Sequence, residues 1–188
     1  MIAHMKMRLA AVLMAALLSS AAAHAQTMEF ACPDPGTTFT YDSGTKVVSR
    51  GRDGIDCNME IVDGKPYKLR ALLFDNPSPD GRDMSAFIDA LRPERLWPLQ
   101  VGKKLEARYG AGGQTWNYIF TVPRYEKRTG PGDALIDTFV VEMQELGAGD
   151  ARAVSRWWIS PADKFAIRFD FSDGKGHANR AIVTGVSH

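Results

Sequence analysis

The chain has 188 residues, of which 45% are hydrophobic and 24% charged, a composition typical of globular proteins and unlike that of disordered, collagen-like or coiled-coil chains. Its 23 Lys and Arg and 22 Asp and Glu give a net charge of +1, which argues against a nucleic-acid partner and against a polybasic membrane anchor. We therefore expect a folded protein that does not bind nucleic acid.

The N-terminal segment has the pattern of a secretory signal peptide. Lys6 and Arg8 precede an apolar run at 9–18, and small residues follow as far as Ala25. An apolar run of about ten residues is shorter than the roughly twenty that a membrane-spanning helix needs. We expect residues 1–25 to be a signal peptide, cleaved near Ala25, and the protein to be periplasmic or secreted; an uncleaved anchor helix is the alternative.

Cleavage changes the properties of the functioning chain. Removal of residues 1–25 leaves 163 of the 188 residues and lowers the cations from 23 to 21 against 22 acids, so the net charge becomes −1. We expect residues 26–188 to form a single β-rich domain, which is long enough for one core. No later segment has eighteen uninterrupted apolar residues, so we expect no integral membrane segment in the mature chain.

The two cysteines, Cys32 and Cys57, both lie in the mature chain. An exported protein meets an oxidising compartment, where a Cys32–Cys57 disulfide is the simplest pairing. The alternative, a redox-active or metal-binding pair, needs a Cys-x-x-Cys spacing or nearby histidines, and the sequence has neither.

In chain order, the apolar spacing is mostly two, and turn residues separate the segments, which predicts antiparallel strands. In the first half we expect two hairpins, formed by strands at 37–41, 46–50, 57–62 and 67–74. Met84, Phe87, Ile88 and Leu91 then follow at helical spacing before Pro93 and predict one short helix that docks onto the sheet.

The second half alternates more clearly. We expect strands at 103–109, 115–122, 136–145, 153–159, 164–171 and 179–186, separated by glycine-rich loops. The predicted fold class is mainly β: a curved antiparallel sheet or half-barrel of about ten strands with one short helix.

Several segments occur in a recognisable order: Leu-Trp-Pro-Leu-Gln-Val-Gly-Lys at 96–103, the aromatic strand 116–122, Tyr-Glu-Lys at 125–127, the turn and strand 131–139, and Trp-Trp-Ile-Ser-Pro at 157–161. In this order the chain resembles a group of uncharacterised bacterial periplasmic β-rich proteins with a Pro-Leu-x-Val-Gly-Lys segment, a Glu-Lys-x-Thr-x-Pro-Ala-Gly-x-Phe strand-turn and a Trp-aromatic-x-x-Pro strand. The resemblance covers 96–171 and departs at 130–136, where Gly-Pro-Gly-Asp-Ala-Leu-Ile replaces the short Pro-Ala-Gly and implies a longer or bulged hairpin. It implies a curved antiparallel sheet in the cell envelope and no catalytic residues.

The sequence offers little for catalysis by a nucleophile or a metal. Only His177 and His188 remain after cleavage, neither has a local partner pattern, and a Gly-x-Ser-x-Gly elbow is absent. Asp75, Asp80 and Asp83 lie close together in sequence, but the spacing of a calcium loop is missing, which favours a solvated loop. We expect no cofactor, no metal and no catalytic residues.

Carboxylates leave one enzymatic alternative open, because glycoside cleavage needs an acid and a base on either side of the bond. The sequence spacing selects no pair among the candidates. These candidates are Glu106, Glu126, Glu142, Glu145 and Asp137. A secreted carboxylate-dependent hydrolase acting on polysaccharide or cell-wall material therefore remains the alternative function.

The adjacent tryptophans Trp157 and Trp158 lie on one predicted strand, so their side chains point to opposite faces of the sheet. One is expected in the core; the other is either packed, for example beneath the helix, or exposed to a ligand. Arg156 and Arg168 are placed to add cation–π or anion contacts. The candidate ligand-binding residues are Trp116, Tyr118, Trp157, Trp158, Arg156 and Arg168.

The predicted function is an exported cell-envelope protein, a non-enzymatic binding or structural module for an apolar or amphipathic ligand or a protein partner. Two features separate this function from the hydrolase. Two carboxyl groups facing each other across a cleft, one of them desolvated, favour the hydrolase, whereas an apolar groove favours binding.

Overall fold

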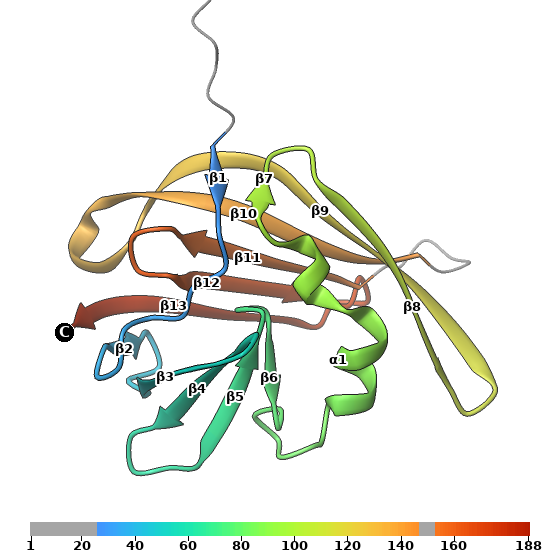
Figure 1. The fold of residues 1–188 in the computed structure, drawn as a ribbon, viewed down its shortest axis with the longest axis horizontal. Helices are drawn as coiled ribbons and strands as arrows, with labels where there is room; N and C mark the ends of the chain where they lie inside the picture. Colours follow the sequence, from blue (N-terminus) through green and yellow to red (C-terminus); the bar gives the residue numbers. More distant parts are fainter. Residues whose placement is uncertain (1–25, 147–152) are drawn as a thin grey trace, which may run out of the picture.

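A single antiparallel sheet of eleven strands, which is not closed, makes up most of the protein (Figure 1). The computed structural model describes residues 26–146 and 153–188, and the expected signal peptide lies outside them. With its single short α-helix, the structure confirms the predicted mainly-β class. The eleven strands are β2 (Thr38–Tyr41), β3 (Lys46–Asp53), β4 (Asp56–Ile61), β5 (Pro66–Arg70), β6 (Phe74–Asn76), β8 (Lys104–Ala111), β9 (Gln114–Thr129), β10 (Leu135–Leu146), β11 (Val154–Ser160), β12 (Phe165–Ser172) and β13 (Ala178–Ser187).

The strand order along the sheet is β6-β5-β4-β3-β2-β13-β12-β11-β10-β9-β8, and every neighbouring pair is antiparallel. Strands β2–β6 therefore form one half of the sheet and β8–β12 the other. Strand β13 pairs with β2 on one side and with β12 on the other, which joins the two halves. Two short strands, β1 (Thr27–Met28) and β7 (Leu99–Gln100), pair separately.

The predicted strand 67–74 is wrong, because the structure divides it into β5 and β6. Ala71 and Leu72 have φ angles of 53° and 60°, in the left-handed region that residues with a Cβ rarely adopt. The chain reverses there, and the amide of Leu73 donates to the carbonyl of Arg70 at 3.0 Å. Neither residue is a glycine, so the sequence did not signal this turn.

The structure also differs from the prediction at three other strands. Strand β9 continues through Pro123 to Thr129, whereas the predicted strand ended at 122. Strands β1 and β7 have two residues each and were not predicted. Such short strands carry no periodicity that a sequence pattern can detect.

The predicted helix is present as α1 (Ser85–Leu91), with Ile88 and Leu91 buried. The 3₁₀ helix η1 (Pro93–Leu96) follows it directly. The Phe87 ring makes edge-to-face contacts with Phe74 on β6, Tyr109 on β8 and Tyr118 on β9, at centroid distances of 5.9, 5.1 and 5.6 Å. The helix thus packs against both edge regions of the open sheet, as expected for a docked helix (Figure 1).

The predicted disulfide joins Cys32 to Cys57 and ties the segment before β2 to β4. Both cysteines belong to the continuous apolar core of the protein. Within it, Phe39 on β2 stacks on Phe165, the first residue of β12, with centroids 3.9 Å apart. The two halves of the sheet are therefore connected by apolar contacts in addition to the backbone pairing of β13.

Candidate arginine pocket on the outer face

Trp157 and Trp158 occupy opposite faces of β11, as the strand geometry predicts. Trp157 pairs in register with Val141 and Phe169 on the inner face, and its ring contacts Phe74 at 5.6 Å. Trp158 pairs with Val140 and Arg168 on the other face. Both are buried, at 5% and 4% exposure, so neither indole is itself an exposed contact surface.

Arginines cover Trp158, and the helix does not. The guanidinium carbons of Arg128 on β9 and Arg168 on β12 lie 4.4 and 5.0 Å from the centre of the indole. At these distances the positive charges are attracted to the electron-rich ring face. The indole Nε1 donates a 2.7 Å hydrogen bond to Oε1 of Glu126. Trp158 is therefore the floor of a polar surface.

This polar surface, the arginine ladder, runs across the outer face from β9 to β13. One row of paired residues across the sheet consists of Arg124, Val140, Trp158, Arg168 and Ile182. The next row consists of Glu142, Arg156, Asp170 and Arg180. Its charged members are Arg124, Glu126, Arg128, Glu142, Arg156, Arg168, Asp170 and Arg180. Five arginines against three carboxylates leave a formal charge of +2 on the ladder.

The carboxylates of the ladder are paired with neighbouring arginines. Asp170 accepts hydrogen bonds from Arg168 at 2.8 and 2.6 Å. Desolvation opposes ionisation of Glu126, but hydrogen bonds from Arg124 and Trp158 outweigh it and hold the pKa of Glu126 below its ordinary value. Arg124 and Arg156 both contact Glu142, at 3.5 and 3.2 Å.

Arg128 is less well matched than the other arginines of the ladder. The nearest carboxylate oxygen, Oε1 of Glu126, is 3.7 Å from its Nη1 and already accepts the Trp158 hydrogen bond. Burial, and then repulsion from Arg168, lower the pKa of the Arg128 guanidinium. Arg128 is thus a partly desolvated cation held next to a like charge.

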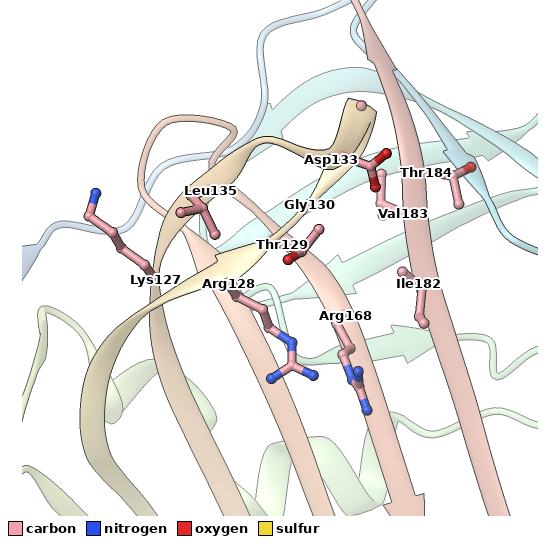
Figure 2. Close-up of a pocket in the computed structure, with 11 residues that line it drawn as sticks. Lys127, Arg128, Thr129, Gly130, Asp133, Leu135, Arg168, Ile182, Val183 and Thr184 are labelled. Atoms are coloured by element: carbon pink, nitrogen blue, oxygen red, sulfur yellow. The ribbon is translucent and has the colours of Figure 1, made fainter.

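An open cavity of about 710 Å³ lies at one end of the ladder, between the β9–β10 hairpin and strands β12 and β13 (Figure 2). The hairpin loop contains the 3₁₀ turn η2 (Pro131–Asp133), in which Gly132 has a φ of 65°. We call this cavity the arginine pocket. Its lining residues are Lys127, Arg128, Thr129, Gly130, Gly132, Asp133, Leu135, Arg168, Ile182, Val183 and Thr184.

The arginine pocket combines charged and apolar surfaces. The Arg128 and Arg168 side chains extend in the same direction from neighbouring parts of the sheet, as Figure 2 shows. Leu135 and Ile182 supply apolar surface, and Leu135 is 68% exposed, more than any other large apolar side chain that the structure describes. The lining of the pocket is therefore both apolar and cationic.

The structure brings together only some of the predicted site residues. Trp158 and Arg168 are in contact, with Arg156 farther along the same face. Trp116 stacks on Tyr109 at 5.8 Å in the β8–β9 hairpin, and Tyr118 contacts Phe87 of the helix, so both belong to a different aromatic cluster.

Arg128 was not predicted as a site residue. The predicted strand ended at 122, six residues before it. A signal was present nonetheless, since the Gly-Pro-Gly-Asp turn at 130–133 marks a hairpin, and Arg128 immediately precedes it.

Asp75 on β6, away from the ladder, is a carboxyl that burial desolvates. Asp75 pairs with Leu69 on the inner side, and burial raises its pKa to about 6. The charge of Asp75 adds to desolvation in raising the pKa values of Tyr41 and Tyr67. Burial is the cause of the Asp75 shift, and no second carboxylate contributes to it.

Among the carboxylates considered for a hydrolase, three are paired with cations on β9–β11: Glu126 with Arg124, Glu142 with Arg156, and Asp137 with Lys127. Of these three, Glu126 has a pKa held below its ordinary value, which makes its carboxyl a poor proton donor at neutral pH.

The aspartates considered for calcium do not converge. Asp80 accepts from Ser78 and pairs with Arg82, whereas Asp83 accepts from the backbone amide of Ser85. Within 26–146 and 153–188, no three His, Cys, Asp or Glu side chains are grouped as they would be around a metal ion. No helix in the same residues has the length and apolar character needed to span a membrane.

Comparison with known proteins does not identify a family for this chain. No family model and no curated protein matches the sequence. One similar solved structure is the crystal structure of the hypothetical lipoprotein YmcC from Escherichia coli (K12), with 11% sequence identity and a TM-score of 0.40. The match covers 78% of this chain and 80% of YmcC.

Proposed function

We propose that this is an exported cell-envelope protein that binds an amphipathic ligand in the arginine pocket and does not act as an enzyme. The observation that carries the proposal is the pocket itself, in which apolar surface and two guanidinium groups line one open cavity of about 710 Å³. Ligand-binding cavities in proteins typically measure about 300–1,000 Å³. The pocket thus has the size and mixed chemistry that such a ligand needs.

The location follows from the N-terminal sequence. The charged, apolar and small-residue segments at 1–25 have the order of a secretory signal, and the resemblance to periplasmic β-rich proteins supports the same compartment. The Cys32–Cys57 disulfide is compatible with an oxidising environment. We place the mature protein in the periplasm or outside the cell.

The apolar part of the ligand is expected to contact Leu135 and Ile182. Each buried methylene group contributes about 0.8 kcal/mol to transfer from water, so a chain of several carbons has enough driving force to bind. The exposed Leu135 side chain gains most from this contact because it is otherwise in water. Leu135 is therefore the residue through which to test the apolar wall.

The test is calorimetric titration of the mature protein, residues 26–188, with dodecyl maltoside below its micelle concentration. The uncharged head group makes this probe a test of the apolar wall alone. We expect Leu135→Asp to weaken binding by about tenfold, equivalent to about 1.4 kcal/mol. The side chain is exposed, so the fold should tolerate the change.

Val101→Asp is the matched control, because Val101 is also an exposed apolar residue, at 46%, but lies outside the pocket. Its affinity for dodecyl maltoside should stay within twofold of that of the unmodified protein. The proposed function would be overturned if neither dodecyl maltoside nor any other amphiphile with a dodecyl chain binds. Equal losses of affinity in the two variants would also overturn it.

A further inference from the structure

The charge balance of the ladder limits the kind of head group that the arginine pocket accepts. Arg168 has a close partner, Asp170, with two hydrogen bonds, whereas Arg128 has its nearest carboxylate oxygen at 3.7 Å. Within the described part of the chain, no hydrogen bond is formed by the Arg128 guanidinium, so its donors are free to bind a ligand. A guanidinium binds a carboxylate through two parallel hydrogen bonds.

The position of Arg128 also makes a bound anion favourable. Arg128 and Arg168 both lie over the same indole, within 5.0 Å of its centre, although their charges repel each other. Repulsion from Arg168 and partial burial both disfavour the charged form of Arg128. An anion placed between the two side chains offsets both costs.

Acidic residues near the pocket oppose a doubly charged ligand. Asp133 lines the same cavity, and Lys127, the third cation of the lining, is paired with Asp137 at 3.3 Å. Because Arg168 is paired with Asp170, Arg128 is the cation of the pocket with the most distant carboxylate, at 3.7 Å. A ligand with one negative charge therefore suits the arginine pocket better than a ligand with two.

We propose that Arg128, assisted by Arg168, binds the head group of a long-chain carboxylate, whose apolar chain lies against Leu135 and Ile182. This inference rests on the proposed function and adds the charge and chemical class of the ligand. Arg128 acts as the binding cation, and its cation–π contact with Trp158 holds the guanidinium in place. The ligand is thus selected by its charge as well as by its apolar chain.

The test compares dodecanoate, dodecyl maltoside and dodecyltrimethylammonium, which have the same chain and differ in head-group charge. We expect dodecanoate to bind the unmodified mature protein at least tenfold more tightly than the other two. Added salt should weaken dodecanoate binding and leave dodecyl maltoside binding unchanged, because ions screen only the charged interaction. Dodecyl phosphate, which carries close to two charges at pH 8, should bind less tightly than dodecanoate.

Arg128→Gln should weaken dodecanoate binding by about tenfold and change dodecyl maltoside binding by less than twofold. Arg128→Lys retains the charge without the two parallel donors and should have an intermediate effect. Arg50→Gln is the matched control, because Arg50 is an exposed arginine that pairs with Glu60 on β3 and β4, outside the pocket. Thermal melts of all three variants establish that they fold.

Two results overturn the inference and are distinguishable from each other. If dodecanoate and dodecyl maltoside bind equally well, and Arg128→Gln changes neither, the pocket binds amphiphiles without charge selection, and only the present inference fails. If none of the amphiphiles binds, the proposed function fails as well.

Discussion

The indole of Trp158 on β11 reaches across β10 and donates a 2.7 Å hydrogen bond to the carboxylate of Glu126 on β9. Thr138 on the intervening strand is fully buried and donates to the backbone carbonyl of the same Glu126 at 3.0 Å. Three adjacent strands are therefore connected by polar side chains as well as by their backbone ladders, and Glu126 is the residue they share.

Trp158→Phe should reduce the free energy of unfolding by about 1–3 kcal/mol, because an aromatic ring is kept, although a smaller one, while the hydrogen bond to a charged acceptor is lost. Equilibrium urea unfolding of the oxidised mature protein measures the change. Trp116→Phe is the control, since Trp116 is half-buried at the β8–β9 hairpin and its Nε1 makes no hydrogen bond within the described residues. Equal losses in the two variants would show that the hydrogen bond to Glu126 contributes nothing.

Asp75 gives the protein a pH-dependent stability. Its pKa in the folded protein, about 6, is above the ordinary value of 3.8, so the folded state binds the proton more tightly than the unfolded state. The resulting stability is fully present below about pH 4 and is lost as the pH rises through 6. At 1.36 kcal/mol for each pKa unit, the loss is at most about 3 kcal/mol, and partial contact with solvent reduces it.

Asp75→Asn should therefore be more stable than the unmodified protein at pH 8 and equally stable at pH 4. Urea unfolding at several pH values measures the difference. Asp63→Asn is the control, because Asp63 is exposed in a turn and asparagine tolerates its φ of 61°. A difference between Asp75→Asn and the unmodified protein that is the same at pH 4 and pH 8 would contradict the assigned titration.

The Cys32–Cys57 bridge closes a loop with a sequence separation of 25, which in the chain-entropy model stabilises the fold by about 3–4 kcal/mol. The double variant Cys32→Ser, Cys57→Ser should melt about 10 °C lower, given about 2–4 °C per kcal/mol for a domain of this size. Reduction of the unmodified protein with dithiothreitol should produce the same shift. An unchanged melting temperature in either experiment would disprove the stabilising role.

Phe74 anchors the three-residue edge strand β6 to the rest of the core. Its ring contacts Phe87 on the helix, Phe120 on β9 and Trp157 on β11, at centroid distances of 5.9, 6.2 and 5.6 Å. Phe74→Ala should lower the free energy of unfolding by about 3 kcal/mol. This is the low end for truncation of a large core side chain, because Phe74 is only half-buried.

Hydrogen exchange provides a second measurement for Phe74→Ala, in which the amides of β5 and β6 should exchange faster than those of β10 and β11. Phe171→Ala, on β12, is the control, because Phe171 is also half-buried but does not belong to this aromatic cluster. Uniformly faster exchange across the whole sheet would indicate global destabilisation and not a local loss of the β6 anchor.

The alternating pattern of apolar residues was enough to predict the strands and the separation of Trp157 from Trp158, because the two-residue period of a strand is a local property. The left-handed turn at Ala71 and Leu72 was not predictable, since it depends on the contacts of the surrounding chain and not on a glycine. Local pattern thus determined where most strands lie but not where each one ends.

The arginine pocket was only partly predictable for a different reason. Arg128 and Arg168 belong to strands separated by β10 and β11, and only the order of strands in the sheet brings them over the same ring. Sequence spacing could identify Trp158 and Arg168 as candidates. It did not indicate that β9, which carries Arg128, would lie two strands away from β11, which carries Trp158.

The central position of β13 determines the order in which the fold can be completed. Strands β2–β6 and β8–β12 can each pair within themselves, yet the two groups share no strand pairing until residues 178–187 arrive between them. Contacts of such large sequence separation form slowly. Until the last strand pairs, β2 and β12 have exposed edges, and this interval is when the protein is most prone to aggregate.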